Sequence, residues 1–581
     1  MKTRASSLYS RYRNLILYAL IGGTGALLDL VVFLILFNAL HLAAVPATVI
    51  SVLFGITNNF ALNTIFNFKK TDRLLLRYTL FTSVGLFGLI LSALILAFGE
   101  VFAINPNLAK VLSIPLVVIA QYILNRHMSF KDFGRNFTVR KFIKVFWSRH
   151  WGLIIINIVF VVSALFMIKS IPPVGVKAGP DEVEHFRSNV EFIATNHRLP
   201  ISGIDDKGSL QTCRANLYGA VPCRYSYVVY PAANYIVSAT VGTVVHDLSG
   251  VSLLKGARVA SMLWGVLFIN VLYLMAHRLT RRRKLSWAVA SIGLLPQVIF
   301  ISSYINQDIH SLAISALCAY ALVALLQDRS RASVIFAGLC FGALLPLAKY
   351  NYFILAPIIA IVIGYVTFVS KSLPYRLFFG LCGATILAFA VISAFWYIRN
   401  YLLYHDVFGQ SFVLKEMSQY APLGRVLPFD AETLAEYTKL GFFSQLFNSF
   451  FLSFGYTAFL MPEANYAILQ AILFSGLLYL TYLIYSTRSR STTLLLLFVW
   501  LLIACVIGLS LYLTYYNAVV YDFQSQGRYL YPILAPIACA LAFSFRLDRR
   551  FTPLIYGLLG VVLYCLFHSI FIILAEYIYT A

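Results

Sequence analysis

The chain has 581 residues, of which 60% are apolar, 15% aromatic and 12% charged. A soluble domain has about 45–50% apolar and about 25% charged residues, so the composition excludes a soluble enzyme and a disordered chain. The net charge is +23, but no basic domain stands apart from the apolar segments, which argues against a nucleic-acid partner. The excess of Lys and Arg is typical of cytoplasmic loops between membrane spans.

The first apolar segment follows a basic N-terminus and predicts a retained span rather than a signal peptide. It exceeds about 20 residues and has no A-x-A-like cleavage site. Fifteen spans are predicted in chain order: 14–40, 43–66, 75–98, 108–126, 152–170, 256–278, 285–303, 309–326, 334–348, 352–370, 377–397, 464–486, 491–515, 529–546 and 553–575.

The charge distribution predicts the orientation of these spans. With the N-terminus in the cytoplasm, the cytoplasmic segments hold 29 of the 45 Lys and Arg but 4 of the 22 Asp and Glu. Lys and Arg collect on the cytoplasmic side, so this split favours a cytoplasmic N-terminus. The segments counted are 1–13, 67–77, 126–150, 278–284, 327–332, 371–376, 487–490 and 546–551.

An internal repeat marks the N-terminal part of the chain. NFALNTIFNFKK at 59–70 matches QYILNRHMSFKD at 121–132, so that Asn63 pairs with Asn125 and Phe68 with Phe130. Each copy closes a predicted two-span unit at the cytoplasmic face, and internal repeats are common in transporter-like folds. The alternative is that Asn and Lys simply mark a membrane edge twice.

This part resembles the GtrA family of small four-span proteins, through GGTGALLDL at 22–30 and the two N-x(4)-F endings. The resemblance implies a role in moving polyprenyl-phosphate-linked sugars across the membrane. Asp29 is an ionisable residue at membrane depth and therefore a functional candidate. The alternative is that Asp29 pairs with a buried Asn or Ser or lies near the interface.

Three segments follow from these patterns. Residues 1–135 are the predicted GtrA-like four-helix domain, 136–151 a basic cytoplasmic linker and 152–581 an eleven-span module. The linker carries Arg and Lys at helical spacing, which is typical of a segment on the membrane surface, but a plain positive-inside signal explains it equally well.

Five polar motifs of the second module are predicted at the outer face. Charges near hydrocarbon are costly unless they face a cavity or find partners. We therefore expect one site, built from several helix ends. The motifs are GPDEVEHF at 179–186, NQD at 306–308, AKYNY at 348–352, WYIRN at 396–400 and QGRYLYP at 526–532.

The acidic motif supplies candidates for a general base. In a helix that starts near Pro180, Asp181 and His185 would share one face. A carboxylate there could accept a proton from an acceptor hydroxyl, with Asp181 as first choice and Glu182 as the alternative. The structural alternative is an acidic helix start favoured by the helix dipole.

The basic motifs supply the complementary charge. Lys349, Arg399 and Arg528 could bind a phosphate leaving group, and Arg does so through a planar fork. The alternative is snorkelling to lipid headgroups, which explains the QGRY sequence less well because Gly527 relaxes the backbone there. Tyr350 and Tyr529 are further candidates for binding the donor phosphate, and Asp308 and Asn400 are further site candidates.

This combination resembles the GT-C superfamily of membrane glycosyltransferases, and in particular a bacterial family with P-D-E-x-x-H-F and G-R-Y-x-x-P signatures. These read PDEVEHF at 180–186 and GRYLYP at 527–532. The resemblance implies inverting transfer from a polyprenyl-monophosphate sugar to a cell-envelope acceptor. It makes Asp181 the base, Lys349 and Arg528 phosphate ligands, and His185 an orienting residue. NQD departs from a tighter Asn–Asp pair, which leaves Asp308 without an assigned role.

We expect an all-α polytopic protein of the bacterial plasma membrane, with its active site and membrane-edge helices on the extracytoplasmic side. Expected partners are the polyprenyl-phosphate sugar, a glycan or lipid-linked envelope acceptor, membrane lipids and the synthase that makes the donor. No ATP or nucleotide-sugar motif occurs. No tightly bound cofactor is expected, although Asp181, Glu182 and His185 could hold Mg or Mn. Cys213 and Cys223 could form a disulfide in an oxidising compartment.

Two other functions remain open from the sequence. The whole chain could be a flippase or transporter that binds lipid phosphate through the same cations but needs no base. It could also be a scaffold that recruits the donor synthase through cytoplasmic residues 126–150.

Overall fold

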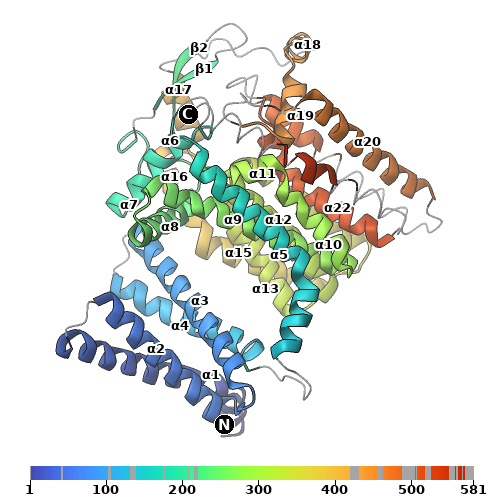
Figure 1. The fold of residues 1–581 in the computed structure, drawn as a ribbon. Coiled ribbons are helices and arrows are strands. Elements are labelled where there is room, and N and C mark those ends of the chain that lie inside the picture. Colours follow the sequence, from blue (N-terminus) through green and yellow to red (C-terminus); the bar gives the residue numbers. More distant parts are fainter. Residues whose placement is uncertain are drawn as a thin grey trace. The chain divides into compact units, whose positions relative to one another are not determined.

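The fold is described from a computed structural model of the chain (Figure 1). The structure describes residues 2–40, 44–101, 106–130, 139–174, 178–206, 209–214, 220–418, 431–454, 460, 462–486, 504, 507–516, 525–547, 557, 560–565 and 567–568. The chain forms two compact units, Met1–Ser148 and Arg149–Ala581. Helix α5 (Val139–Ser170) contains most of the predicted linker and the predicted fifth span.

The first unit is a helical bundle in which two hairpins repeat. Its helices are α1 (Lys2–Leu34), continued by the π-turn η1 (Ile35–Ala39), α2 (Ala44–Leu62), continued by η2 (Asn63–Asn67), α3 (Leu74–Val101) and α4 (Pro106–His127). Helix α1 packs against α2, and α3 packs against α4. The predicted four-helix repeat is therefore present.

Aromatic rings from both hairpins pack together in one cluster of the first unit. Phe68 and Phe130, which are paired in the sequence repeat, stack with centroids 4.3 Å apart. Tyr18 packs edge-on against Phe68, and Phe81 packs edge-on against Phe130 in the same way. The repeated motif thus forms the core where the two hairpins meet, which is a packing role rather than a mark of the membrane edge.

The repeated asparagines make equivalent hydrogen bonds inside this core. Asn67 donates to Oδ1 of Asn63 at 2.9 Å, and the hydroxyl of Ser129 donates to Oδ1 of Asn125 at 2.6 Å. All four side chains are buried. Buried polar groups are costly without partners, so these bonds explain why polar residues recur at the two helix ends.

The second unit is a larger helical assembly. Its elements are α6 (Glu182–His185), η3 (Phe186–Glu191), α7 (Phe192–Asn196), β1 (Ser209–Arg214), β2 (Ala220–Tyr225), α8 (Ala233–Ser249), α9 (Leu253–Thr280), α10 (Arg283–Ala290), η5 (Ser291–Leu294), α11 (Pro296–Ile301), α12 (Asp308–Asp328), α13 (Arg331–Leu339), η6 (Cys340–Leu344), η7 (Leu345–Leu347), η8 (Tyr350–Ile354), α14 (Leu355–Gly364), η9 (Tyr365–Val369), α15 (Tyr375–Ala388), η10 (Phe389–Ser393), α16 (Ala394–Tyr404), α17 (Gln410–Ser418), α18 (Ala431–Lys439), α19 (Phe442–Phe451), α20 (Glu463–Ser486), η12 (Gly527–Ile533) and α22 (Leu534–Leu547).

Helices α9 and α12 form the centre of this unit. Helix α9 packs against α8, α10, α12 and α22. Side chains such as Phe268 and Leu312 are completely enclosed. By contrast, Phe379 and Val391 on α15 and η10 are mostly exposed. Apolar side chains that face outward along a continuous helix are what a lipid-facing surface requires.

The structure is that of an all-α polytopic membrane protein with one small β-hairpin among its described residues. Strands β1 and β2 pair antiparallel. Within the same residues, six helices are long and apolar enough to span a bilayer: 13–34, 150–170, 253–280, 308–328, 350–369 and 375–404. Four shorter apolar helices add to these. The count of fifteen spans stays a prediction, because 491–515 and 553–575 lie largely outside the described residues.

Candidate functional site

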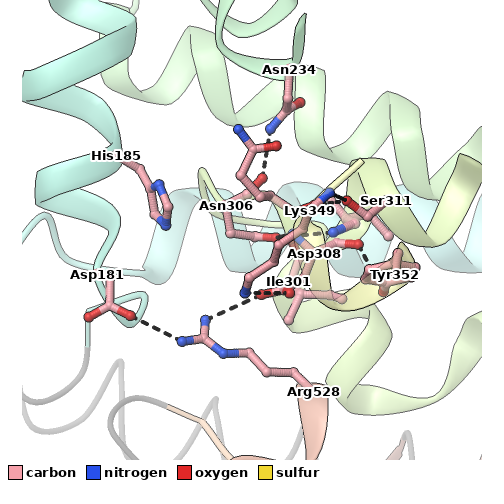
Figure 2. A network of polar contacts seen from close by, with 12 residues as sticks. Asp181, His185, Asn234, Ile301, Asn306, Asp308, Ser311, Lys349, Tyr352 and Arg528 are labelled. Carbon is pink, nitrogen blue, oxygen red and sulfur yellow. Dashed lines mark hydrogen bonds and ion pairs between the residues drawn. The ribbon is translucent and has the colours of Figure 1, made fainter. Parts of the chain in front are cut away.

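Four charged side chains from distant parts of the second unit meet in one cluster (Figure 2). Nη2 of Arg528 donates to Oδ2 of Asp181 at 3.1 Å. Nζ of Lys349 donates to Oδ1 of Asp308 at 2.9 Å, and Nη1 of Arg528 lies 3.7 Å from Oδ2 of the same carboxylate. The predicted acid of the first outer motif, Asp181, therefore contacts one predicted cation, Arg528, and a second predicted cation, Lys349, joins the cluster through Asp308.

Asp181 occupies a strained turn directly before α6. Its backbone has φ 62° and ψ 7°, in the left-handed region that non-glycine residues rarely adopt. The helix begins at Glu182 rather than near Pro180, but the amide of His185 still donates to the carbonyl of Asp181. The carboxylate does not cap this helix. It is therefore available to Arg528, and strain of this kind clusters at functional sites.

Asp308 is held at the first turn of α12 by the NQD motif. Oδ1 of Asn306 accepts hydrogen bonds from the amides of Asp308 and Ile309, at 2.9 and 3.1 Å. The Asp308 side chain is 1% exposed and bridges Lys349 and Arg528. A buried charge is stable only when it is paired. Asp308, which the sequence left without a role, is thus the residue that holds both cations.

Arg528 lies at the start of η12, where its guanidinium is almost completely buried. Besides Asp181, it donates from Nη1 to the hydroxyl of Tyr304 at 2.8 Å. Its Nε–H is buried and has no acceptor among the described residues. The Tyr529 ring lies 5.5 Å from the guanidinium and 5.0 Å from Nζ of Lys349. The cluster can therefore offer donor groups to an anion.

Gly527 is required by close packing rather than by an unusual backbone angle. A Cβ atom at this position would meet the backbone of Phe450 and the carbonyl of Leu446 on α19. The Gly527 amide donates to the Ser449 hydroxyl at 2.7 Å. The absence of a side chain thus lets η12 lie directly on α19, which places the next residue, Arg528.

Gly527→Ala is expected to lower the stability of the protein by about 1–3 kcal/mol, because backbone atoms of α19 must move to admit the methyl group. The measurement is the thermal unfolding midpoint of the purified protein in detergent. Gly383→Ala is the matched control, because a Cβ there meets nothing within 4 Å. An unchanged midpoint for Gly527→Ala would contradict the packing argument.

His185 faces the cluster from α6 and is buried (Figure 2). Its Nδ1 is hydrogen-bonded to the hydroxyl of Tyr235 at 2.6 Å, and its ring packs on Tyr227. Burial, together with the positive charges of Lys349 and Arg528, holds the pKa of His185 well below its ordinary value of 6.5. The imidazole is therefore neutral at neutral pH and can donate or accept one hydrogen bond.

This environment predicts an acid-sensitive contribution to stability. As the pH is lowered through 6.5, His185 becomes protonated in the unfolded chain but stays neutral in the folded chain, because its pKa is lowered there. The free energy of unfolding therefore decreases as the pH is lowered. His185→Gln cannot titrate and is expected to lose less stability between pH 7 and pH 5 than the wild type. Thermal unfolding at both pH values tests this, with His246→Gln as an exposed control. Equal losses in wild type and His185→Gln would contradict it.

Glu182 pairs with Arg258 and not with a cation of the charged cluster. Its carboxylate accepts from Nε and Nη2 of Arg258, at 2.8 and 2.5 Å, and from the amide of Ile305 at 3.0 Å. These bonds do not support the alternative that Glu182 is the base. A divalent cation held by Asp181, Glu182 and His185 stays a prediction. No group of three or more His, Cys, Asp or Glu in the described ranges is arranged to hold a metal ion.

The WYIRN motif does not join the charged cluster. Nη2 of Arg399 donates to the carbonyl of Pro200, and its guanidinium stacks over Trp396 at 5.0 Å. Asn400 donates instead to the carbonyl of Val229, and so does the hydroxyl of Tyr350. The prediction that Arg399 and Tyr350 bind phosphate is therefore not supported by their contacts, because Arg399 bonds the carbonyl of Pro200 and Tyr350 bonds the carbonyl of Val229.

Sequence reasoning missed Arg258 and Tyr304. Arg258 is a cation inside the predicted span 256–278, and ionisable residues at such positions are functional candidates by default. That signal was present in the sequence. Tyr304 lies two residues before Asn306, and only its hydrogen bond to Arg528 distinguishes it from the other tyrosines of the chain.

Three further predicted residues belong to other segments of the chain: Asp29, Cys213 and Cys223. Asp29 is half-buried on α1, and a Cβ at Gly55 would meet the Asp29 side chain. The side chains of Cys213 and Cys223 lie outside the described residues, so their disulfide stays a prediction. In the strand register, Cys213 is opposite Val221, and Cys223 is opposite Gln211.

Comparison with known proteins assigns both parts of the chain. Residues 17–130 and 80–174 match the GtrA/DPMS transmembrane domain. Residues 207–537, more than half of the chain, match the family described as predicted membrane protein (DUF2142). No curated protein matches the sequence.

Among solved structures, the chain is similar to the archaeal oligosaccharyltransferase AglB from Archaeoglobus fulgidus in complex with an inhibitory peptide and a dolichol-phosphate. The match has 17% identity and a TM-score of 0.34, and it covers 74% of this chain. The aligned region spans 55% of that protein. The family match covers the residues that form most of the charged cluster, and the chain belongs to the DUF2142 family of membrane proteins, with a GtrA/DPMS transmembrane domain at its N-terminus.

Proposed function

We propose that this protein is a membrane glycosyltransferase of the GT-C type, which moves a sugar from a polyprenyl-monophosphate donor to a hydroxyl of a cell-envelope acceptor. The observation that carries the proposal is the cluster of Asp181 and Asp308 with Lys349 and Arg528. It combines a carboxylate that can accept a proton with two cations that can bind a phosphate.

The chemistry is a single displacement with inversion at the anomeric carbon. The acceptor oxygen forms a bond to that carbon while the bond from the carbon to the phosphate oxygen breaks. Asp181 takes the proton of the acceptor hydroxyl. The departing polyprenyl phosphate gains one negative charge, which Arg528 and Lys349 stabilise because they are already fixed where that charge develops.

The buried Nε–H of Arg528 supports this assignment. Buried donors are nearly always satisfied, so an unpaired one on a guanidinium that shares Asp308 with Lys349 is well suited to an anionic ligand. A phosphate could accept from Nε and Nη2 together, in the bidentate geometry that arginine favours. In the structure Nη2 is bonded to Asp181, so the donor phosphate would compete with the base for the same guanidinium.

The N-terminal unit is proposed to present or flip the lipid-linked sugar, in line with its match to the GtrA/DPMS domain. The charge distribution of the loops supports a plasma-membrane protein with a cytoplasmic N-terminus and an extracytoplasmic site. Both a divalent cation and recruitment of the donor synthase remain predictions of the same proposal.

The test is sugar transfer by the purified full-length protein, given a polyprenyl-phosphate sugar and envelope glycan acceptors. Formation of a glycosylated product and release of polyprenyl phosphate are expected in equal amounts. A flippase would instead move the donor between the leaflets of a vesicle without consuming it. Donor that crosses the bilayer and stays intact would overturn the proposal in favour of that alternative.

A further inference from the structure

Arg258 forms several buried hydrogen bonds next to the site, but none of those bonds is to a residue of the charged cluster. Its guanidinium is 1% exposed and forms a two-bond fork with Glu182. The other donors go to backbone carbonyls: Nη1 to Ile168 at 3.1 Å and Ile171 at 2.8 Å, and Nη2 to Pro172 at 3.4 Å. One side chain thus satisfies the carbonyls at the C-terminal end of α5 and fixes the first residue of α6.

This pair links the two segments that carry the acids of the cluster. Glu182 directly follows Asp181, and its Oε1 also accepts from the amide of Ile305. Ile305 lies in the segment between α11 and α12, three residues before Asp308. The end of α5, the strained turn at Asp181 and the segment before Asp308 therefore share one buried ion pair.

A close packing contact strengthens this link. A Cβ atom at Gly179 would meet the ring of Tyr304, and the Tyr304 hydroxyl accepts from Arg528. The turn that carries Asp181 therefore lies against the residue that holds Arg528. A change at Glu182 or Arg258 would alter where Asp181 lies relative to Arg528.

We propose that Arg258 is a positioning residue for the transfer reaction, which acts through Glu182 to hold Asp181 at the acceptor hydroxyl. This inference rests on the proposed function and deepens it. Lys349 and Arg528 are held by Asp308 rather than by Arg258, so the pair sets the place of the base and leaves phosphate binding largely alone.

A purely structural role makes a different prediction. Replacing a buried ion pair with apolar residues of similar size is often neutral or stabilising, whereas removing one partner leaves an uncompensated buried charge. Arg258→Met should therefore destabilise the protein, and Glu182→Met combined with Arg258→Met should restore the part of its stability that the unpaired Glu182 charge costs. If the pair serves stability alone, transfer activity returns with stability. If it positions Asp181, activity stays low in the stable double variant.

The experiment uses the purified full-length protein and compares four variants with the wild type: Arg258→Met, Arg258→Lys, the double Met variant and Arg198→Met. Arg198 is the matched control, because it forms a two-bond pair with Asp205 in the same unit but is half exposed. Each variant is measured for its thermal midpoint, its kcat and KM for the donor, its Kd for polyprenyl phosphate and the hydrogen exchange of residues 179–186.

In the double variant we expect a thermal midpoint above that of Arg258→Met, faster exchange over 179–186 and a kcat lower than that of the wild type by about 100-fold, because small displacements of a reacting group cost that much. The Kd for polyprenyl phosphate stays close to that of the wild type. Arg258→Lys recovers part of kcat because it keeps the charge but not the fork. Arg198→Met is unchanged in all readouts.

Recovery of both kcat and midpoint in the double variant would overturn the inference and leave the proposed function standing. Loss of polyprenyl-phosphate binding in parallel with kcat would overturn it too, because the effect would then reach the cations. A wild-type protein that binds polyprenyl phosphate but transfers no sugar would instead refute the proposed function, and with it the role of Arg258.

Discussion

Asp181→Asn is expected to lower the rate of sugar transfer by about 1,000-fold, within the range that a general base contributes. The amide keeps the shape of the side chain but cannot accept the acceptor proton. Asparagine also tolerates the left-handed backbone of this position, φ 62°, because its short polar side chain can bond locally. The fold should therefore survive the change.

Binding of the donor should respond in the opposite direction. In the resting protein the carboxylate of Asp181 occupies Nη2 of Arg528. Asn carries no charge, so Arg528 is left to the phosphate, and the Kd for polyprenyl phosphate is expected to fall or stay equal. Transfer kinetics and calorimetric titration with polyprenyl phosphate measure the two effects. Full activity in Asp181→Asn would show that Asp181 is not the base.

Arg528→Ala is expected to lower kcat/KM by about 1,000-fold and Arg528→Lys by about 100-fold, the scale observed when a preorganised donor to a developing negative charge is removed. Lysine keeps the charge, but it cannot bind a phosphate through two parallel bonds. Alanine also leaves the Asp181 carboxylate without the guanidinium and removes the donor to Tyr304.

The Kd for polyprenyl phosphate distinguishes Arg528→Ala from Asp181→Asn. Arg528→Ala should weaken polyprenyl-phosphate binding, whereas Asp181→Asn should not. Arg399→Lys is the matched comparison, because Arg399 bonds the Pro200 carbonyl outside the cluster, and we expect a far smaller loss of transfer. Equal losses in the Arg399 and Arg528 variants would show that both arginines serve general folding.

Members of the charged cluster could be predicted from the sequence where the residue type and its position in the chain are sufficient. The GRY and DE motifs identified Arg528 and Asp181, and their order relative to the apolar segments placed them at the same predicted membrane level. The repeat identified Phe68 and Phe130 before their stacking was visible, because two copies of one hairpin bury the same residues at the same interface.

Pattern alone could not decide between neighbouring residues of one motif. Asp181 and Glu182 are adjacent acids, yet the turn directs the first to Arg528 and the second to Arg258. That choice depends on a positive φ at Asp181, a backbone state that local sequence does not favour for a non-glycine residue. Likewise Arg399 and Lys349 looked equivalent in sequence, but in the structure Lys349, directly before η8, bonds Asp308, whereas Arg399 on α16 bonds the Pro200 carbonyl.

Composition and periodicity are enough to predict a membrane protein with an N-terminal repeat and with charged motifs between its spans, because burial in lipid constrains every position. Which of those charges meet depends on how the helices pack. Asp181 and Arg528 are 347 residues apart, and partners so distant are chosen by helix packing and by the need to pair every buried charge, neither of which a local pattern encodes.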